Sequence, residues 1–204
     1  MRLTSIGLAP VLGSRCVSCG RAGPALCSAC ANECRRCAVS QPIHGIERTI
    51  APWAYEGAPR ELILALKLRG RRSAAEPLAH ATARAAQRAS MRAEVVTWVP
   101  GRRRDIRVRG YDHAEVLARG VAEILGLPAV SLVTRVADPP DQTSLGAEQR
   151  RRNLQGAFVA TPWTGGPVVI VDDLVTTGAT LAACAAALRT TATGGVEALA
   201  PCRA

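Results

Sequence analysis

Aromatic side chains are scarce in this chain of 204 residues, which contains one phenylalanine, two tyrosines and three tryptophans. Proteins that bind single-stranded nucleic acid without sequence preference commonly stack successive bases on aromatic rings. A stacking platform of that kind is poorly supplied here. If the chain contacts DNA, we expect binding that is mostly electrostatic and that weakens as the salt concentration rises.

Long apolar stretches are also missing, and no segment has the length and apolarity of a membrane-spanning helix. Residues 1–13 carry Arg2 and some apolar residues, but Gly7, Pro10 and Gly13 interrupt them. We therefore expect neither membrane insertion nor a secretory signal, and the cytoplasm is the expected location. In that compartment the eight cysteines call for metal binding or burial rather than for disulfides.

Lysine is nearly absent as well. Lys67 is the only lysine among 26 basic residues, which outnumber the 16 acidic residues and give a formal net charge of +10. This excess favours anionic ligands. A single lysine in a chain that otherwise uses arginine indicates a position that needs an ammonium group.

What the chain does have, first, is a cysteine-rich beginning. Residues 14–37 hold three C-x-x-C pairs, namely Cys16/Cys19, Cys27/Cys30 and Cys34/Cys37. Two such pairs supply four thiolates, enough for a tetrahedral zinc site. A disulfide framework would need an oxidising compartment, and a redox pair would need a thioredoxin-like context that the segment lacks. We predict structural Zn²⁺ on the first two pairs, with Cys34 and Cys37 as alternates that are otherwise spare or part of a second, incomplete site.

After Ser40 the pattern alternates between strands and helices. The predicted elements are a strand over residues 46–55, a helix with Pro59 at its first position, an Ala-rich helix over 76–91, a strand over 95–99, a basic loop over 102–109, a helix ending at Gly126, strands over 130–136, 158–160 and 168–171, and a last strand over 196–200, with a loop and an arginine-rich helix over 138–153. Such alternation predicts a doubly wound parallel sheet whose ligand lies beyond the carboxyl ends of the strands.

The most informative stretch is Val168–Thr180. Four apolar residues read as a buried strand, which stops at Asp172 and Asp173, and a Thr/Gly turn leads into a helix from Ala179. The beginning of a helix after such a turn favours phosphate binding, because backbone N–H groups and the helix dipole point at the anion. The two carboxylates could hold vicinal hydroxyls one sugar-length away. The alternative is that the two aspartates only cap the helix and bind no ligand. The motif resembles that of type I phosphoribosyltransferases, which bind phosphoribosyl pyrophosphate (PRPP).

A substrate with a 5′-phosphate and a pyrophosphate requires a second anion site. Three basic clusters compete for it, at residues 67–72, 102–109 and 150–152. Each could instead be a solvated charged face. The first two follow predicted strand–helix units that could open toward one sheet edge, which favours them over the third.

The order of motifs over residues 14–200 resembles the ComF family of phosphoribosyltransferase-like proteins linked to DNA uptake. The motifs that carry the resemblance are the CxxC-rich head, Tyr55-Glu-Gly57, Leu66-Lys-Leu-Arg-Gly70, Val99-Pro100, Arg109-Gly-Tyr-Asp112, Asp141-Gln-Thr-Ser-Leu145, Arg152-Asn153, Gly156-Ala-Phe158 and the Asp172-Asp173 loop. The resemblance implies a zinc-binding head at residues 1–40 and a type I phosphoribosyltransferase-like domain at 41–204.

The resemblance also implies ligands, partners and site residues. It implies PRPP with Mg²⁺, transfer of the phosphoribosyl group to an acceptor that is not identified, and a link to single-stranded DNA or a helicase-like DNA-uptake protein. The implied PRPP-binding residues are Asp172, Asp173, Thr176, Thr177, Gly178, Ala179, Thr180, Arg69 and Gly70, and the implied catalytic residues are Lys67, Arg107 and Arg109. The alternative on the same fold is a non-catalytic protein that senses PRPP or binds DNA or a partner.

One motif departs from the family pattern. Many members have Arg-Gly-Phe-Asn-Gln where this chain has Arg109-Gly-Tyr-Asp-His113. His113 at the start of a helix could be a general base, but an exposed side chain is the simpler expectation. The head also has three CxxC pairs rather than the four of many relatives.

Overall fold

The computed structural model describes residues 14–37, 42–137, 154, 156–192 and 194–204. Its helices are α1 (Ser28–Asn32), α2 (Gly57–Leu68), the 3₁₀ turn η1 (Arg72–Ala74), α3 (Ala75–Arg88), α4 (Arg103–Arg109), α5 (His113–Leu125) and α7 (Ala179–Arg189). Its strands are β1 (Thr49–Ile50), β2 (Trp53–Ala54), β3 (Val95–Trp98), β4 (Val133–Arg135), β5 (Phe158–Ala160), β6 (Val168–Val171), β7 (Leu174–Val175), β8 (Val196–Leu199) and β9 (Cys202–Arg203). None of the helices in these ranges has the length and apolarity that crossing a membrane requires.

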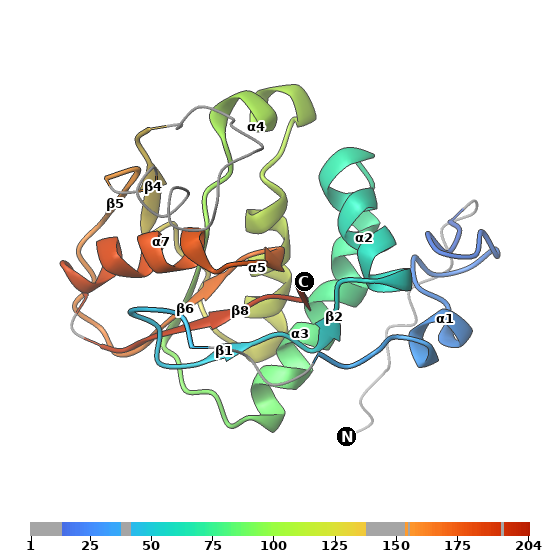
Figure 1. Cartoon of the computed structure of the whole chain (residues 1–204), viewed down its shortest axis with the longest axis horizontal. Helices are drawn as coiled ribbons and strands as arrows, with labels where there is room; N and C mark the ends of the chain where they lie inside the picture. Colours follow the sequence, from blue (N-terminus) through green and yellow to red (C-terminus); the bar gives the residue numbers. More distant parts are fainter. Residues whose placement is uncertain (1–13, 38–41, 138–153, 155, 193) are drawn as a thin grey trace, which may run out of the picture.

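The central sheet is parallel throughout, in the order β1-β8-β6-β3. Every residue of β6 is buried, and successive residues face opposite sides: Val169 and Val171 pack with α3 and α5, whereas Val168 and Ile170 pack with α7. Figure 1 shows α7 on the near face of the sheet and α3 and α5 on the far face. Burial on both faces explains why the strand reads as an unbroken apolar run. The predicted doubly wound parallel sheet is confirmed.

Three neighbouring strands are interrupted at the same level and then continue. β1, β8 and β6 are followed after two residues by β2, β9 and β7, which form a second parallel sheet in the same order, β2-β9-β7. The interruptions are Ala51-Pro52, Ala200-Pro201 and Asp172-Asp173. Proline has no N–H to donate to a sheet, so two of the three breaks have a local cause. The third break places the two aspartates.

Several predicted elements need correction. The strand expected over 46–55 is the broken pair β1 and β2, and the strand expected over 196–200 is not the last, because β9 follows it. Pro59 is the third residue of α2 rather than the first, a position in the first turn where its missing N–H costs nothing. The arginine-rich stretch expected over 138–153 lies outside the described residues.

The basic segment at residues 102–109 was expected to be a loop and is mostly helix α4. Arginine has a good helix propensity, and Gly110 ends the helix in the left-handed conformation, with φ of 79°. None of its residues is buried, so the usual apolar stripe that reveals a helix in a sequence is missing. This lack of an apolar face is the physical reason why the helix was read as a loop.

The cysteine-rich head packs on the beginning of α2. Cys16, Cys27, Cys30 and Ala58 form a small buried cluster of their own, apart from the two clusters on the faces of the sheet. Figure 1 shows the head and α1 beside α2, at one end of the molecule. The head therefore borders the helix whose other end carries Lys67.

Candidate functional site: an acid pair and a cysteine cluster

Asp172 and Asp173 occupy the interruption between β6 and β7, where a parallel sheet presents its carboxyl ends. Asp173 is only 4% exposed, whereas Asp172 is partly exposed. The Asp173 N–H donates to Asp172 Oδ1 at 2.8 Å. The Asp172 N–H still donates to the Leu199 carbonyl of β8 at 3.0 Å, so the sheet ladder is interrupted only after Asp172, whose side chain accepts from the backbone N–H of its neighbour.

Lys67 reaches the acid pair from the last turn of α2. Its Nζ lies 3.0 Å from Asp173 Oδ2 and 3.4 Å from Oδ1. The Lys67 side chain remains 41% exposed, against 6% for that of Asp173, so one partner is buried and the other still meets solvent. The only lysine of the chain thus serves as the counter-ion of a buried carboxylate.

The charges around the pair split the two acids. Burial alone would raise the pKa of Asp173, but the contact with His113 and the positive charge of Lys67 outweigh it and hold that pKa below its usual range. For Asp172, burial and the neighbouring Asp173 charge raise the pKa to about 7. Burial lowers the pKa of Lys67, yet the attraction of Asp173 is stronger and the pKa rises. Near neutral pH Asp173 is therefore ionised, whereas Asp172 is only partly ionised.

A Thr/Gly turn and α7 follow the acids in the predicted place. Gly178 is the N-cap of α7, with φ of 73°, and a side chain there would lie 2.6 Å from Ile43. Both the positive φ and the crowding explain the glycine. Thr176 and Thr177 are exposed, and the Ala179 N–H donates to Thr177 Oγ1 at 3.4 Å. The turn therefore presents two exposed threonines, one of which is hydrogen-bonded to the first residue of the 11-residue helix α7.

The other predicted residues lie at the end of α2, in the turn after it, and on α4. Arg69 forms an ion pair with Glu61 on α2 at 3.0 Å, and Gly70 adopts a φ of 67° in the turn after α2. Arg107 is exposed on α4. Arg109 is half-buried at the end of α4, where its Nη1 lies 2.9 Å from His113 Nδ1. The third basic cluster, at 150–152, lies outside the described residues.

His113 is the residue that the sequence reading missed. It was expected to be exposed, but it is 8% exposed, and its Nε2 lies 3.5 Å from Asp173 Oδ2. Its place at the start of α5 is fixed by Asp112, whose Oδ1 accepts from the Ala114 N–H at 3.0 Å. The sequence signal for this contact was the departure from the family pattern at Asp112 and His113.

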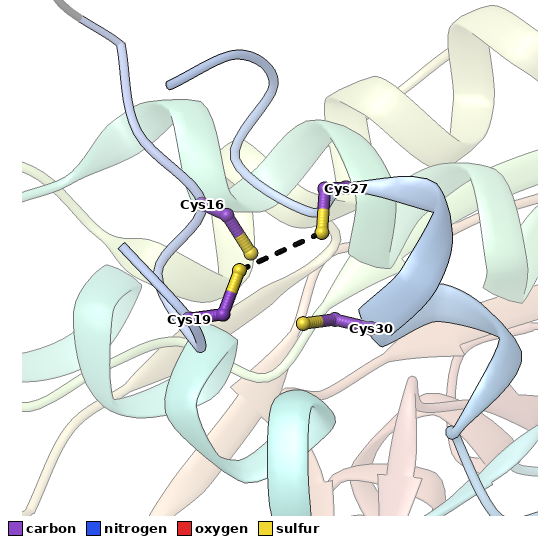
Figure 2. Close-up of side chains that lie close together, drawn as sticks. All are labelled: Cys16, Cys19, Cys27 and Cys30. Carbon is purple, nitrogen blue, oxygen red and sulfur yellow. Dashed lines mark hydrogen bonds between the residues drawn. The ribbon is translucent and has the colours of Figure 1, made fainter. Parts of the chain in front are cut away.

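Four cysteines of the head come together in the second candidate site (Figure 2). The Sγ atoms of Cys16, Cys19, Cys27 and Cys30 all lie within 4.8 Å of one another, and those of Cys19 and Cys27 are 3.7 Å apart. Thiolates about 2.3 Å from a central ion would have this spacing. The set could hold a metal such as zinc.

The surroundings shift the pKa values of two of these thiols in opposite directions. Burial would raise the pKa of Cys16, but backbone N–H groups of Cys19 and Cys27 outweigh it and lower that pKa to about 6. A hydrogen bond involving Ser18 favours the thiolate of Cys30, but the neighbouring thiols of Cys19 and Cys27 raise its pKa to about 12. A bound cation would favour the thiolate form of all four cysteines. The alternate Cys34 instead donates its S–H to the Cys30 carbonyl at 3.3 Å.

Comparisons with known proteins found partial matches to curated proteins. The chain is 38% identical over 97 residues to the DNA utilization protein YhgH of Salmonella typhi, which covers 47% of this chain and 43% of that protein. It is 38% identical over 78 residues to competence protein F of Haemophilus influenzae, covering 36% and 34% of the two chains. The resemblance to the ComF family is confirmed. The chain matches less than half the length of these relatives, and no family model matches it.

Two solved structures are similar in part. Orotate phosphoribosyltransferase from Aeropyrum pernix aligns with a TM-score of 0.37 and 18% identity over 71% of this chain and 76% of that one. UMP synthase from Leishmania donovani aligns with the same score and identity over 65% of this chain and 22% of that one.

Proposed function

We propose that this chain is a PRPP-binding protein of the phosphoribosyltransferase type, which transfers the phosphoribosyl group to a nucleophilic acceptor. The observation that carries the proposal is the acid pair at the break between β6 and β7, directly before the Thr/Gly turn and α7. Asp172 and Asp173 would hold the two ribose hydroxyls. The turn at Thr176–Thr180 and the helix dipole would hold the 5′-phosphate.

The split between the two acids suits a diol. Each hydroxyl both donates and accepts a hydrogen bond. Asp173, whose pKa is lowered, can only accept, whereas Asp172, whose pKa is raised to about 7, can also donate when protonated. The pair therefore offers both kinds of partner near neutral pH, and it avoids facing a pyrophosphate with two full negative charges.

Lys67 is placed to connect the acids to the leaving group. An ammonium group has three donors, and the Nζ contacts with Asp173 leave part of this partly exposed group for a pyrophosphate oxygen. Arg69 and Gly70 in the same segment, with Arg107 and Arg109 on α4, would complete the pyrophosphate site. Mg²⁺ would enter with PRPP and would neutralise negative charge that develops on the leaving pyrophosphate.

Calorimetric titration of PRPP with Mg²⁺ tests the binding step. The wild type is expected to bind, and the Asp172→Ala/Asp173→Ala variant is expected to lose measurable binding. Glu123→Ala, which removes one exposed acid of α5, is the matched control and should bind as the wild type does. Equal affinity of the double variant and the wild type would refute the role of the acids.

Pyrophosphate release from PRPP, measured with a panel of purines, pyrimidines and amines, tests catalysis. Lys67→Met is expected to lower turnover about 100-fold, because one well-placed donor to developing charge contributes on the order of 3 kcal/mol. Its PRPP affinity should fall less than its turnover. Binding without pyrophosphate release for every acceptor would leave a PRPP sensor rather than an enzyme.

We also propose that the cysteine cluster binds one structural Zn²⁺ ion through Cys16, Cys19, Cys27 and Cys30.

A second candidate function, a direct role in handling DNA, is favoured by the names of the relatives, competence protein F and DNA utilization protein, and by the net charge of +10. Retention on immobilised single-stranded DNA that declines between 50 and 300 mM salt (about the range in which such contacts weaken) would support it. Retention at neither salt concentration would exclude it.

A further inference from the structure

His113 lies among charged groups that come from three separate elements. Its Nε2 is 3.5 Å from Asp173 Oδ2, next to β6, and its Nδ1 is 2.9 Å from Arg109 Nη1 at the end of α4. Asp112 Oδ1 is 3.9 Å from Nδ1. With only 8% of the residue exposed, these groups rather than solvent determine the state of the ring.

The contact with Arg109 fixes which ring nitrogen carries the proton. A guanidinium group can only donate, so the nitrogen that faces it at 2.9 Å must accept. Nδ1 is then without a proton, the ring is neutral, and the proton is on Nε2. Nε2–H is the side of the ring that faces Asp173. Arg109 thus turns His113 into a donor toward the buried acid.

The backbone on either side of the ring is held in place. Asp112 caps α5 and also accepts from the Gly101 N–H at 2.8 Å, which ties the start of α5 to the turn after β3. The Tyr111 hydroxyl donates to the carbonyl of Leu66, the residue before Lys67. One short segment, residues 111–113, therefore sets the distance between the lysine and the acid that it contacts.

The two contacts to Asp173 do not use its oxygens equally. Lys67 and His113 both approach Oδ2 most closely, at 3.0 and 3.5 Å, and in the described part of the chain Oδ1 receives only the longer Lys67 contact of 3.4 Å. An ionised carboxylate has about four acceptor positions. Oδ1 consequently keeps acceptor capacity for a hydroxyl group of a ligand.

We propose that His113 is a positioning residue: held by Arg109 as the Nε2–H tautomer, it fixes the Asp173 carboxylate through Oδ2 so that Oδ1 is free for a sugar hydroxyl. The inference deepens the proposed PRPP site and rests on it for the identity of the hydroxyl. It also assigns Arg109 a second task, because the same guanidinium group that would face pyrophosphate sets the tautomer of the ring.

Nitrogen-15 NMR of histidine-labelled protein tests the tautomer without any ligand. The resonances of His113 are assigned by their loss in His113→Gln. The expected result is a protonated Nε2 and an unprotonated Nδ1 near neutral pH. Asp173 still accepts from Nε2–H in Arg109→Ala, but Nδ1 no longer faces a donor, so in that variant Nδ1 should take up a proton at a higher pH than in the wild type. A protonated Nδ1 in the wild type near neutral pH, or an Nδ1 that is protonated over the same pH range in both proteins, would overturn the arrangement.

PRPP titration of the His113 variants tests the positioning role. His113→Ala should weaken binding about tenfold, as expected for loss of a hydrogen bond to a charged group. His113→Gln should restore most of it, because the amide oxygen can accept from Arg109 and the amide N–H₂ can donate to Asp173. Thermal melts test whether both variants are folded. If His113→Ala is unfolded, His113→Asn takes its place, because the asparagine side chain is too short to reach both partners.

The two proposals fail in different ways. If the wild type does not bind PRPP, the proposed function is wrong, whereas the tautomer experiment still decides whether Arg109 orients the ring. If the wild type binds and Asp172→Ala/Asp173→Ala does not, but His113→Ala and His113→Gln both bind as tightly as the wild type, then the site stands and the positioning role of His113 is wrong.

Discussion

The cysteine cluster and the acid pair are built in opposite ways. The four clustered cysteines all lie within residues 16–30, and each C-x-x-C turn brings its own two sulfurs together. The acid pair depends on Lys67, which is 106 residues away from Asp173, and on His113, which starts a different helix. A local site of this kind can be read from spacing alone, whereas a site assembled from distant elements depends on the sheet and helices that carry it.

The largest effect is expected when the local site is broken. Cys16→Ser/Cys19→Ser should reduce bound zinc from about one ion per chain to near zero, because a structural site needs all four ligands. The head should lose its fold, since metal binding on the order of 10 kcal/mol is also folding free energy in such small units. Metal analysis and thermal melts measure both effects.

Cys34→Ser is the matched control for that prediction. It removes a cysteine of the third pair, whose S–H donates to a backbone carbonyl, and it should keep the zinc content of the wild type. Equal zinc loss in both variants would show that the first two pairs do not suffice.

A smaller effect is expected when the long-range site is broken at Lys67. Lys67→Met should lower the free energy of unfolding by about 2 kcal/mol, because it leaves Asp173 buried without its main counter-charge; the partial exposure of Lys67 keeps the loss below that of a fully buried pair. Urea denaturation measures the change. The double variant Lys67→Met/Asp173→Asn should recover most of it, and no recovery would mean that the lysine acts through packing alone.

The effect of pH on the acid pair is the smallest of the three when it is counted per pH unit. The pKa of Asp172 is raised to about 7 from an unfolded value near 3.8, so between these values the native state holds a proton that the unfolded chain has released. The free energy of unfolding should therefore fall as pH rises from about 4 to about 7, with a slope of at most about 1.4 kcal/mol per pH unit, and then level off.

Asp172→Asn should remove that slope when urea denaturation is compared at several pH values. Asp173 acts in a separate window: its pKa is lowered, so its stabilising contribution is present above the unfolded value near 3.8 and is lost only at more acid pH. A slope between pH 4 and 7 that persists in Asp172→Asn would show that other groups carry it.

Much of the fold was predictable because it follows local rules. The buried run Val168–Val171 predicted β6, the Thr/Gly turn leading into a helix from Ala179 predicted α7, and the structure has both. The exposed helix α4 was not predictable in this way, since it buries none of its residues and so has no apolar stripe. The breaks after β1 and β8 were not predicted. A proline indicates where a backbone hydrogen bond of the sheet is lost, but it does not indicate that the strands continue beyond it.

For the two candidate sites, the sequence by itself determined the residues and the local motifs. These are two adjacent acids at the end of a strand, a Thr/Gly turn before a helix, one lysine, and four cysteines at metal-binding spacing. These are local patterns, and backbone geometry ties each to a short stretch of chain. Only the tertiary structure decided that Lys67 and His113 converge on Asp173, that Arg109 faces the ring, and that the pKa values of the two acids are shifted in opposite directions. Such contacts depend on how helices pack across a sheet, and the resulting fields depend on burial, which no local spacing specifies.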